Sequence, residues 1–370
     1  MDQLNFFTLN ECIWNQRCEV FIILLVPFVL ALLFCYLIVI STSLHGRLTF
    51  DESHGVQKIH DKATPRIGGI GIYLSLLIAG LFSPNATPLL LLVVSALPAF
   101  CAGLAEDLTK KVSPIQRLAA TVVSGWLAFY LTGYHLTSIG IPQVDVVFSV
   151  IWISVLFSAI AVAGIANAYN IIDGFNGLAG LTAFTSFIVI GQLSQSVGDQ
   201  ELATISWIFA TATLGFIVLN WPRGRLFLGD GGAYALGFSI GWLSIMLVER
   251  NHAVSPFACL LICIYPITEV IFSMYRRIRR NKDATGPDRL HIHSLFGRRF
   301  INRRFIKMSS TNKNSMTGFG MSLISIPAAV AVQFVYDSTL LCTLFSALFL
   351  IFYLLAYRRL VKFRWLLHRK

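Results

Sequence analysis

Apolar runs long enough to cross a membrane dominate the chain and constrain its fold more than any other feature. About 20 apolar residues span the hydrocarbon core of a bilayer as a helix, where irregular backbone cannot satisfy its polar groups. The clearest run begins at Phe21 and continues past Ile40. No small-residue cleavage site follows it, so we read it as a retained first span and not as a signal peptide.

The same length rule predicts about eleven spans and therefore an all-α integral membrane protein. Only 13% of the 370 residues are charged, where a soluble chain has about a quarter. We expect one polytopic membrane domain over residues 1–370, with no separate soluble domain. The approximate span centres are Leu30, Leu77, Val94, Trp126, Ser158, Phe187, Ile208, Gly241, Leu261, Val330 and Phe349.

The distribution of basic residues predicts the orientation. With eleven spans, all but Arg17 and Arg250 of the 29 lysines and arginines fall on the side that holds the C-terminus. The positive-inside rule makes that side cytoplasmic and the N-terminus periplasmic. A net charge of +11 could suggest a nucleic-acid partner, but charge placed in this way sets topology and meets anionic lipid or phosphate. We expect no nucleic-acid binding.

Two adjacent carboxylates, Glu106 and Asp107, end an apolar run at this cytoplasmic side. Charges at the edge of a span are costly and by default indicate function. Neighbouring acids also repel, so they favour a cation or a shared proton between them. The plainer interpretation is a solvated helix end, with Lys110 and Lys111 as partners.

Two further junctions combine acids, amides and glycines. The segment 167–177 contains Asn170, Asp173 and Asn176; if it is helical, Asn170 and Asp173 share a face. A simple turn would also account for its Asn and Gly. The segment 227–232 places Asp230 before two glycines, which suits a hard cation with backbone amides near phosphate. The alternative is that Asp230 caps a helix.

Two basic segments complete the set. Arg289, His291 and His293 lie in the long loop 276–318. Without a third nitrogen or sulfur ligand this HxH spacing does not favour zinc, and it suits a polyphosphate better. Lys62 lies before Gly68 and Gly69, where phosphate contact and topology-setting charge are both reasonable interpretations.

The five clusters occupy five alternate loops, so all of them are expected on one face. Their oxygen ligands favour Mg²⁺, or Mn²⁺, over zinc. Carboxylates, a hard cation and cationic side chains are the groups that phosphoryl transfer requires. The seven cysteines form no CxxC pair, and we interpret them as buried apolar side chains.

These motifs, in this order from about Gly46 to Phe296, resemble the polyprenyl-phosphate N-acetylhexosamine-1-phosphate transferases (WecA/TagO/MraY type), and the WecA branch most. The resemblance implies a catalytic core at about 46–296, followed by two plainer spans and a basic tail at 319–370. It also implies a multi-pass protein of the bacterial inner membrane. The reaction would transfer a sugar-1-phosphate from a UDP-amino sugar to undecaprenyl phosphate, with Mg²⁺, releasing UMP and initiating synthesis of an O-antigen-like polysaccharide.

The resemblance also assigns roles to individual residues. Glu106 stands where the family has Asp, and Asn176 where it has a second Asp; Ser294 ends a histidine run that usually continues. In the implied mechanism Asp107 or Glu106 removes a proton from the lipid phosphate, which attacks the β-phosphorus of the donor. The implied catalytic residues are Glu106, Asp107, Asp173, His291 and His293, the metal ligands Asp230 and Asp107, and the substrate-binding residues Lys62, Asn170, Asn176, Phe227 and Arg289.

Several alternatives stay open at this stage. UDP-N-acetylglucosamine is the family default, but UDP-GalNAc, UDP-FucNAc and UDP-QuiNAc fit the same motifs. A transporter or lipid flippase would also contain intramembrane acids, although it should place them near the bilayer midplane. A non-catalytic scaffold for polysaccharide assembly is a third class. A homodimer is compatible with the sequence.

Overall fold

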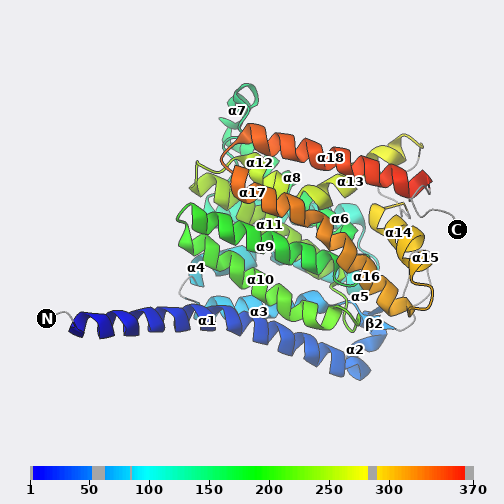
Figure 1. The fold of residues 1–370 in the computed structure, drawn as a ribbon, viewed down its shortest axis with the longest axis horizontal. Helices are drawn as coiled ribbons and strands as arrows, with labels where there is room; N and C mark the ends of the chain where they lie inside the picture. Colours follow the sequence, from blue (N-terminus) through cyan, green and yellow to red (C-terminus); the bar gives the residue numbers. More distant parts are fainter. Residues whose placement is uncertain (1–2, 52–62, 84–85, 282–289, 363–370) are drawn as a thin grey trace.

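The computed structural model describes residues 3–51, 63–83, 86–281 and 290–362, with side chains of the first helix from Phe21 onward. The expected all-α fold is confirmed, because most of these residues are helical (Figure 1). The described part of the chain also contains turns, loops and a pair of two-residue antiparallel strands, β1 (Phe50–Asp51) and β2 (Thr64–Pro65), in which Phe50 lies opposite Pro65.

The multi-pass membrane architecture is also supported, since within the described ranges seven helical segments are long and apolar enough to cross a bilayer. Two bent pairs raise this number to nine if each pair is one span, bending by 45° and 78°. The long helices are α1 (Gln3–Ile40), α8 (Ile151–Ile172), α9 (Leu178–Ser196), α10 (Gln200–Asn220), α11 (Gly229–Arg250), α16 (Ser310–Ser322) continued through the 3₁₀ turn η2 (Leu323–Ser325) into α17 (Ile326–Val335), and α18 (Thr339–Lys362). The bent pairs are α4 (Ala86–Ser95) with α5 (Leu97–Thr109), and α12 (Pro256–Ile262) with α13 (Ile264–Ile278).

Two of the predicted spans fall outside that set. The predicted centres Leu77 and Trp126 do lie in helices, α3 (Gly68–Phe82) and α6 (Pro114–Thr132). However, α3 has only 15 residues, and α6, with 19, does not count among the nine candidate spans. Nine candidates are therefore two fewer than the eleven expected.

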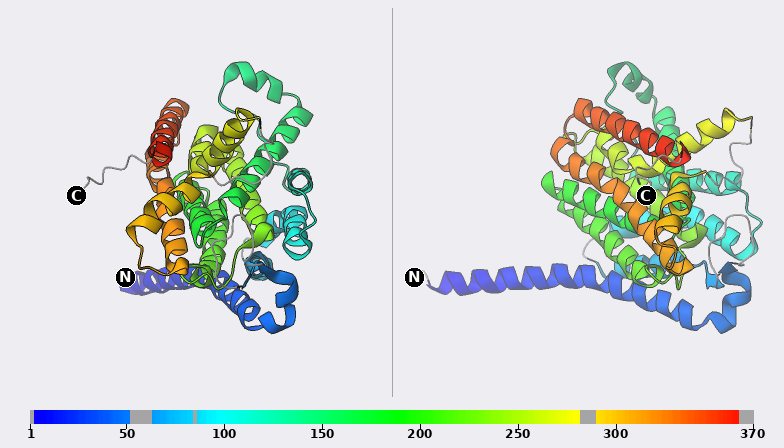
Figure 2. Two further views of the ribbon diagram at one scale, coloured as in Figure 1. Left: turned by 90° about the vertical axis from the view of Figure 1, so that its right-hand side faces the viewer. Right: turned by 45° about the vertical axis from the view of Figure 1, so that its right-hand side comes forward.

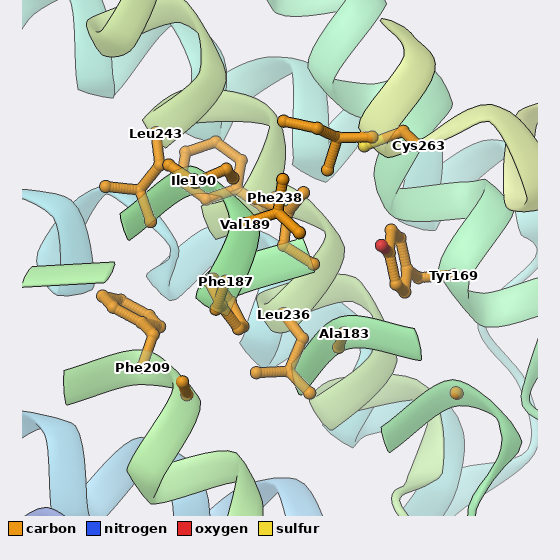
Figure 3. Close-up of a cluster of buried hydrophobic side chains, with 14 of the residues drawn as sticks. Tyr169, Ala183, Phe187, Val189, Ile190, Phe209, Leu236, Phe238, Leu243 and Cys263 are labelled. Carbon is orange, nitrogen blue, oxygen red and sulfur yellow. The ribbon is translucent and has the colours of Figure 1, made fainter. Parts of the chain in front are cut away.

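Helix α11 lies at the centre of the bundle. In its most apolar window 94% of the residues are buried, against 17% for α1 and for α18 at the periphery. Figure 3 shows the core beside it, where Phe238 and Leu243 meet Phe187 of α9 and Phe209 of α10. Such contacts place the polar N-terminal end of α11 at the middle of one end of the bundle.

The short elements cluster mainly at that end, which we call the site end. Figure 2 views it head-on in its left panel. The helix α16 begins at Ser310, inside the loop that the sequence extended to residue 318, so its polar first turns belong to this end. The short helices are α2 (Thr42–Thr49), α14 (Ile292–Phe296), the π-helix η1 (Gly297–Ile301) and α15 (Asn302–Arg304), with α7 (Pro142–Phe148) at the opposite end.

Candidate active site

Asp107 caps the N-terminus of α11 from the neighbouring helix α5. Its Oδ1 accepts a hydrogen bond from the Asp230 backbone N–H at 2.9 Å, and its Oδ2 accepts one from Gly231 N–H at 3.0 Å. A carboxylate at this position satisfies free amides and is attracted by the helix dipole. The alternative interpretation, that Asp230 caps the helix, is therefore wrong: Asp230 lies inside the first turn, and Asp107 is the cap. The Asp230 and Gly231 amides serve this contact instead of an open phosphate site.

The Asp230 carboxylate is buried and lies between two arginines. Arg66, just before α3, places Nη2 3.2 Å from Asp230 Oδ1 and 3.4 Å from Asp107 Oδ1. Arg117 of α6 donates to Asp230 Oδ2 and also lies over the Tyr234 ring, 5.6 Å from its centroid. Charge-assisted contacts of this kind are roughly twice as strong as neutral ones. They place two cationic groups beside a buried carboxylate at the end of the central helix.

Glycines allow the three helix ends to approach so closely. A Cβ on Gly69 of α3 would collide with Gly232, and a Cβ on Gly103 of α5 would lie 2.6 Å from the Asp230 carbonyl oxygen. Gly229 has a φ of +76° and faces the Arg66 carbonyl and the Asp107 carboxylate. Helix packing thus accounts for these glycines without any need for phosphate contact.

Glu106 faces away from this cluster. Its Oε2 accepts a hydrogen bond from Val112 N–H at 2.7 Å, which ties the end of α5 to the loop before α6. Consecutive residues of a helix point in directions about 100° apart, so the two acids of the sequence pair separate. The geometry gives Glu106 a part in shaping the loop.

Asp173 lies immediately after α8, so it does not share a helical face with Asn170 as the sequence suggested. It is half-buried, and its N–H bonds to the Asn170 carbonyl oxygen at 3.2 Å. Burial raises the pKa of Asp173 from 3.8 to about 7, against the opposing effect of the Arg66 guanidinium. Asp173 also interacts electrostatically with Asp107. Three aspartates from three different helix ends therefore share one site with Arg66 and Arg117.

Asn176 is buried and holds the turn after α8 against α16. Its N–H donates to Asn314 Oδ1 at 2.7 Å, and its Nδ2 donates to Ser315 Oγ at 3.0 Å. These bonds show why the polar start of α16 packs at the site end. Asn170 is half-buried, and its side chain makes no hydrogen bond within the part of the chain that the structure describes.

The two histidines stack on each other and are held by a buried glutamate. Their ring centroids lie 5.1 Å apart, and His293 also meets the edge of Phe175 at 5.7 Å, which brings it beside the Asp173 turn. Glu269 of α13 is fully buried; its Oε1 bonds to His291 Nδ1 at 2.9 Å and accepts Ile292 N–H at 3.1 Å. Its Oε2 accepts the Tyr353 hydroxyl of α18 at 3.0 Å. The C-terminal helix thus supports the histidine segment.

The sequence reasoning missed the roles of Arg66, Arg117 and Glu269. The two arginines looked like topology-setting charge, while Glu269 carried a usable signal as an isolated acid within an apolar run. Phe227 is half-buried and lies between β2 and α3, through backbone bonds to Pro65 and Gly68. The predicted substrate residues Lys62 and Arg289 lie outside the described residues.

The oxygen donors at the site end decide which metal the cluster could hold. Among the described residues no three His, Cys, Asp or Glu side chains form a complete cage. Mg²⁺, however, is usually held by one or two carboxylates and substrate phosphates. Asp230 fits such a site once Arg66 and Arg117 turn away from its two carboxylate oxygens, whereas both Asp107 oxygens bond to backbone amides that are fixed in α11.

Residues 89–248 match the profile of glycosyl transferase family 4. A Bacillus subtilis protein described as a probable undecaprenyl-phosphate N-acetylglucosaminyl 1-phosphate transferase is 25% identical over 82% of this chain and 81% of its own length. The Thermotoga maritima undecaprenyl-phosphate alpha-N-acetylglucosaminyl 1-phosphate transferase is 28% identical over 66% and 71%, respectively. The protein of that name from Escherichia coli K12 is 29% identical over 65% and 67%.

The matched segment contains Asp107, Asp173 and Asp230, the three aspartates that the fold brings together. Arg66 and the histidine pair lie outside it but reach the same end of the bundle. The resemblance seen in the motifs is therefore confirmed: residues 89–248 match glycosyl transferase family 4, and the chain is similar to undecaprenyl-phosphate N-acetylglucosaminyl 1-phosphate transferases.

Proposed function

We propose that this protein transfers N-acetylglucosamine-1-phosphate from UDP-N-acetylglucosamine to undecaprenyl phosphate, forming undecaprenyl-diphospho-N-acetylglucosamine and UMP. The observation that carries the proposal is the convergence of Asp107, Asp173 and Asp230 with Arg66 and Arg117 at one end of a membrane bundle. Phosphoryl transfer depends mainly on positioned charge of this kind. The names of the relatives supply the acceptor and the donor sugar.

Each residue of the site has a role that follows from its position. Asp107 fixes the start of α11 and so the direction of the Asp230 carboxylate. With a pKa of about 7, an Asp173 carboxylate oxygen can take the residual proton of the lipid phosphate near neutral pH. The phosphate oxygen then attacks the β-phosphorus, the bond to the UMP oxygen breaks, and UMP leaves. Arg66, Arg117 and His291 bind the charged oxygens.

Asp230 is the proposed protein ligand of Mg²⁺, with Mn²⁺ as an alternative. When bound, the ion would neutralise the diphosphate and the developing charge on UMP. Arg66 and Arg117 would then turn from Asp230 toward the phosphates, since both already reach the edge of the same carboxylate.

The orientation and the eleven spans belong to the same proposal. Helix α6 runs the length of α11: Arg117 near its start bonds to Asp230, while Thr137 beyond its end bonds to Glu249 at the far end of α11. A 19-residue helix is about 28 Å long, close to the apolar thickness of a bilayer. Counting α3 and α6 as crossings gives eleven spans, with the site end in the cytoplasm of a bacterium and the bundle in its inner membrane.

The remaining choice concerns the sugar and the pathway. UDP-GalNAc, UDP-FucNAc and UDP-QuiNAc carry the same diphosphate and are the alternative donors. The proposed pathway is the synthesis of an O-antigen-like polysaccharide. A screen of purified protein with undecaprenyl phosphate and these four donors, measuring UMP release, identifies the donor. Release that does not need the lipid would argue against transfer.

A matched pair of variants tests the site. Asp230→Asn should lower UMP release at least 100-fold, a loss expected when a transition-state charge partner is removed. Asp199→Asn is the control, because Asp199 pairs with Arg250 at the opposite end of the bundle. If Asp230→Asn retains its activity, the metal role is excluded.

Metal removal is a separate test of the same role. EDTA should abolish UMP release from the wild-type protein, and Mg²⁺ should restore it.

A further inference from the structure

A basic cavity opens at the site end, separate from the aspartate cluster. It has a volume of about 300 Å³ and lies between α13, η1 and α18. Four arginines line it, and no carboxylate of a described residue does: Arg276, Arg279, Arg280 and Arg299. Like charges so close repel one another, so the cavity favours an anion.

The inner arginines are fixed before any ligand arrives. Arg276 is buried, donates to the Tyr357 hydroxyl at 3.0 Å, and lies 5.6 and 5.4 Å from the ring centroids of Phe272 and Tyr357. Arg299 donates to backbone carbonyls at the end of α18, among them Leu360. Guanidinium groups held in this way bind a phosphate with little further ordering cost.

The helices that form the cavity carry both exposed charge and exposed apolar side chains. Arg279 and Arg280 are exposed at the end of α13. On the same helix Ile271 and Ile278 are 62% and 61% exposed, and Leu355 of α18 is 57% exposed. In a bilayer these side chains meet acyl chains, while the arginines lie at headgroup level. A soluble anion would not contact these exposed apolar side chains.

We propose that this cavity binds the phosphate headgroup of an anionic phospholipid from the leaflet at the site end. Basic pockets between membrane helices bind such headgroups in other proteins. The cavity is also lined by Leu290, which precedes His291, so a bound lipid would contact the base of the histidine segment. The inference does not depend on the transfer reaction proposed above.

Native mass spectrometry of the full-length protein in detergent tests the proposal with phosphatidylglycerol and phosphatidylcholine as probes. The wild-type protein should retain phosphatidylglycerol preferentially. The double variant R279Q/R280Q should weaken this binding about 30-fold, from about 1 kcal/mol for each arginine near a phosphate. The control R358Q/R359Q removes the same charge from exposed residues of α18 that do not line the cavity.

Two outcomes would overturn the proposal. Equal losses in both double variants would mean diffuse attraction to the basic end of the protein. Equal retention of the two lipids by the wild-type protein would mean no headgroup site. A further arm adds inorganic phosphate at millimolar concentration: displacement of the lipid would identify a soluble-anion site instead, while continued lipid binding supports the phospholipid.

Discussion

Glu106 and Asp107 are neighbours in the chain, yet they bond to different parts of the molecule. The Glu106 carboxylate accepts one loop amide, from Val112, which a glutamine oxygen can also accept. Glu106→Gln should therefore change UMP release less than about threefold, since it keeps a neutral hydrogen bond worth about 1 kcal/mol. Parallel assays of purified protein measure it. A 100-fold loss of UMP release would instead support a catalytic role for Glu106 together with Asp107, as the sequence suggested.

Asp107→Ala is expected to act on the helix it caps. Both oxygens are lost from the first turn of α11, and losing a helix cap costs about 0.5–2 kcal/mol. Thermal unfolding in detergent should show a lower midpoint, together with reduced activity because Asp230 is less well positioned. An unchanged midpoint would contradict the capping role.

Asp173 predicts a pH dependence with a definite sign. Its pKa of about 7 means that the carboxylate becomes mostly protonated below neutrality, so kcat/KM should fall as the pH drops below about 7. The folded state also holds a proton between pH 3.8 and 7 that the unfolded state releases, so rising pH lowers the contribution of Asp173 to stability over that range. Asp173→Asn should abolish most activity. It should also make the midpoint of thermal unfolding less dependent on pH between pH 5 and 8. An acid limb that persists in the residual activity of this variant would assign it to another group.

For individual residues, the sequence identified the acidic residues of the candidate site better than the basic ones. Asp107, Asp173 and Asp230 were recognisable because an acid at a span end is unusual. Arg66 and Arg117 were not, because arginines at cytoplasmic span ends are common and only the fold reveals that two of them contact Asp230. Lys62 and Arg289 lie outside the described residues, so their substrate contacts stay predictions.

Among the helices, α18 contributes more than its peripheral place suggests. The Tyr353 hydroxyl donates to Glu269, which holds His291, and removing one bond to a buried carboxylate costs about 1–3 kcal/mol. Tyr353→Phe should therefore lower kcat roughly tenfold with little change in KM for the donor. Tyr336→Phe is the control, since the Tyr336 hydroxyl does not touch this network. Equal effects of both changes would reduce the role of α18 to bulk packing.

The positions of helices were more predictable than their shapes. Each predicted span centre lies within or beside a helix, because an apolar run of sufficient length leaves the backbone few alternatives. The 78° bend between α12 and α13 had no such signal. It depends on tertiary packing, and it directs α13 so that Glu269 reaches the histidines. The early start of α16 was missed for a related reason: its polar turns are stabilised by Asn176, which is distant in sequence.

On the scale of the whole molecule, charge and geometry support one orientation. Among the described residues, the site end holds Arg66, Arg117, Arg276 and Arg299. Arg250, at the other end, forms ion pairs at 2.8 Å with Asp199 and with Glu201, so it adds little unbalanced positive charge there. The positive-inside rule counts mainly basic residues near span ends. The site end also holds the aspartate cluster, which is the arrangement that the proposed cytoplasmic site and nucleotide-sugar donor require.

The loop between α5 and α6 distinguishes eleven crossings from nine. If α3 and α6 both cross, Lys111 is cytoplasmic; if neither crosses, the same residue is periplasmic. Lys111→Cys in the full-length chain should therefore resist a membrane-impermeant maleimide in intact spheroplasts and react after permeabilisation. Ser196→Cys, in the exposed end of α9 at the opposite face, should react in both conditions, and the wild-type chain gives the background from its own cysteines. Labelling of both Lys111→Cys and Ser196→Cys in intact spheroplasts would exclude the eleven-span arrangement, because that arrangement places the two residues on opposite sides of the membrane.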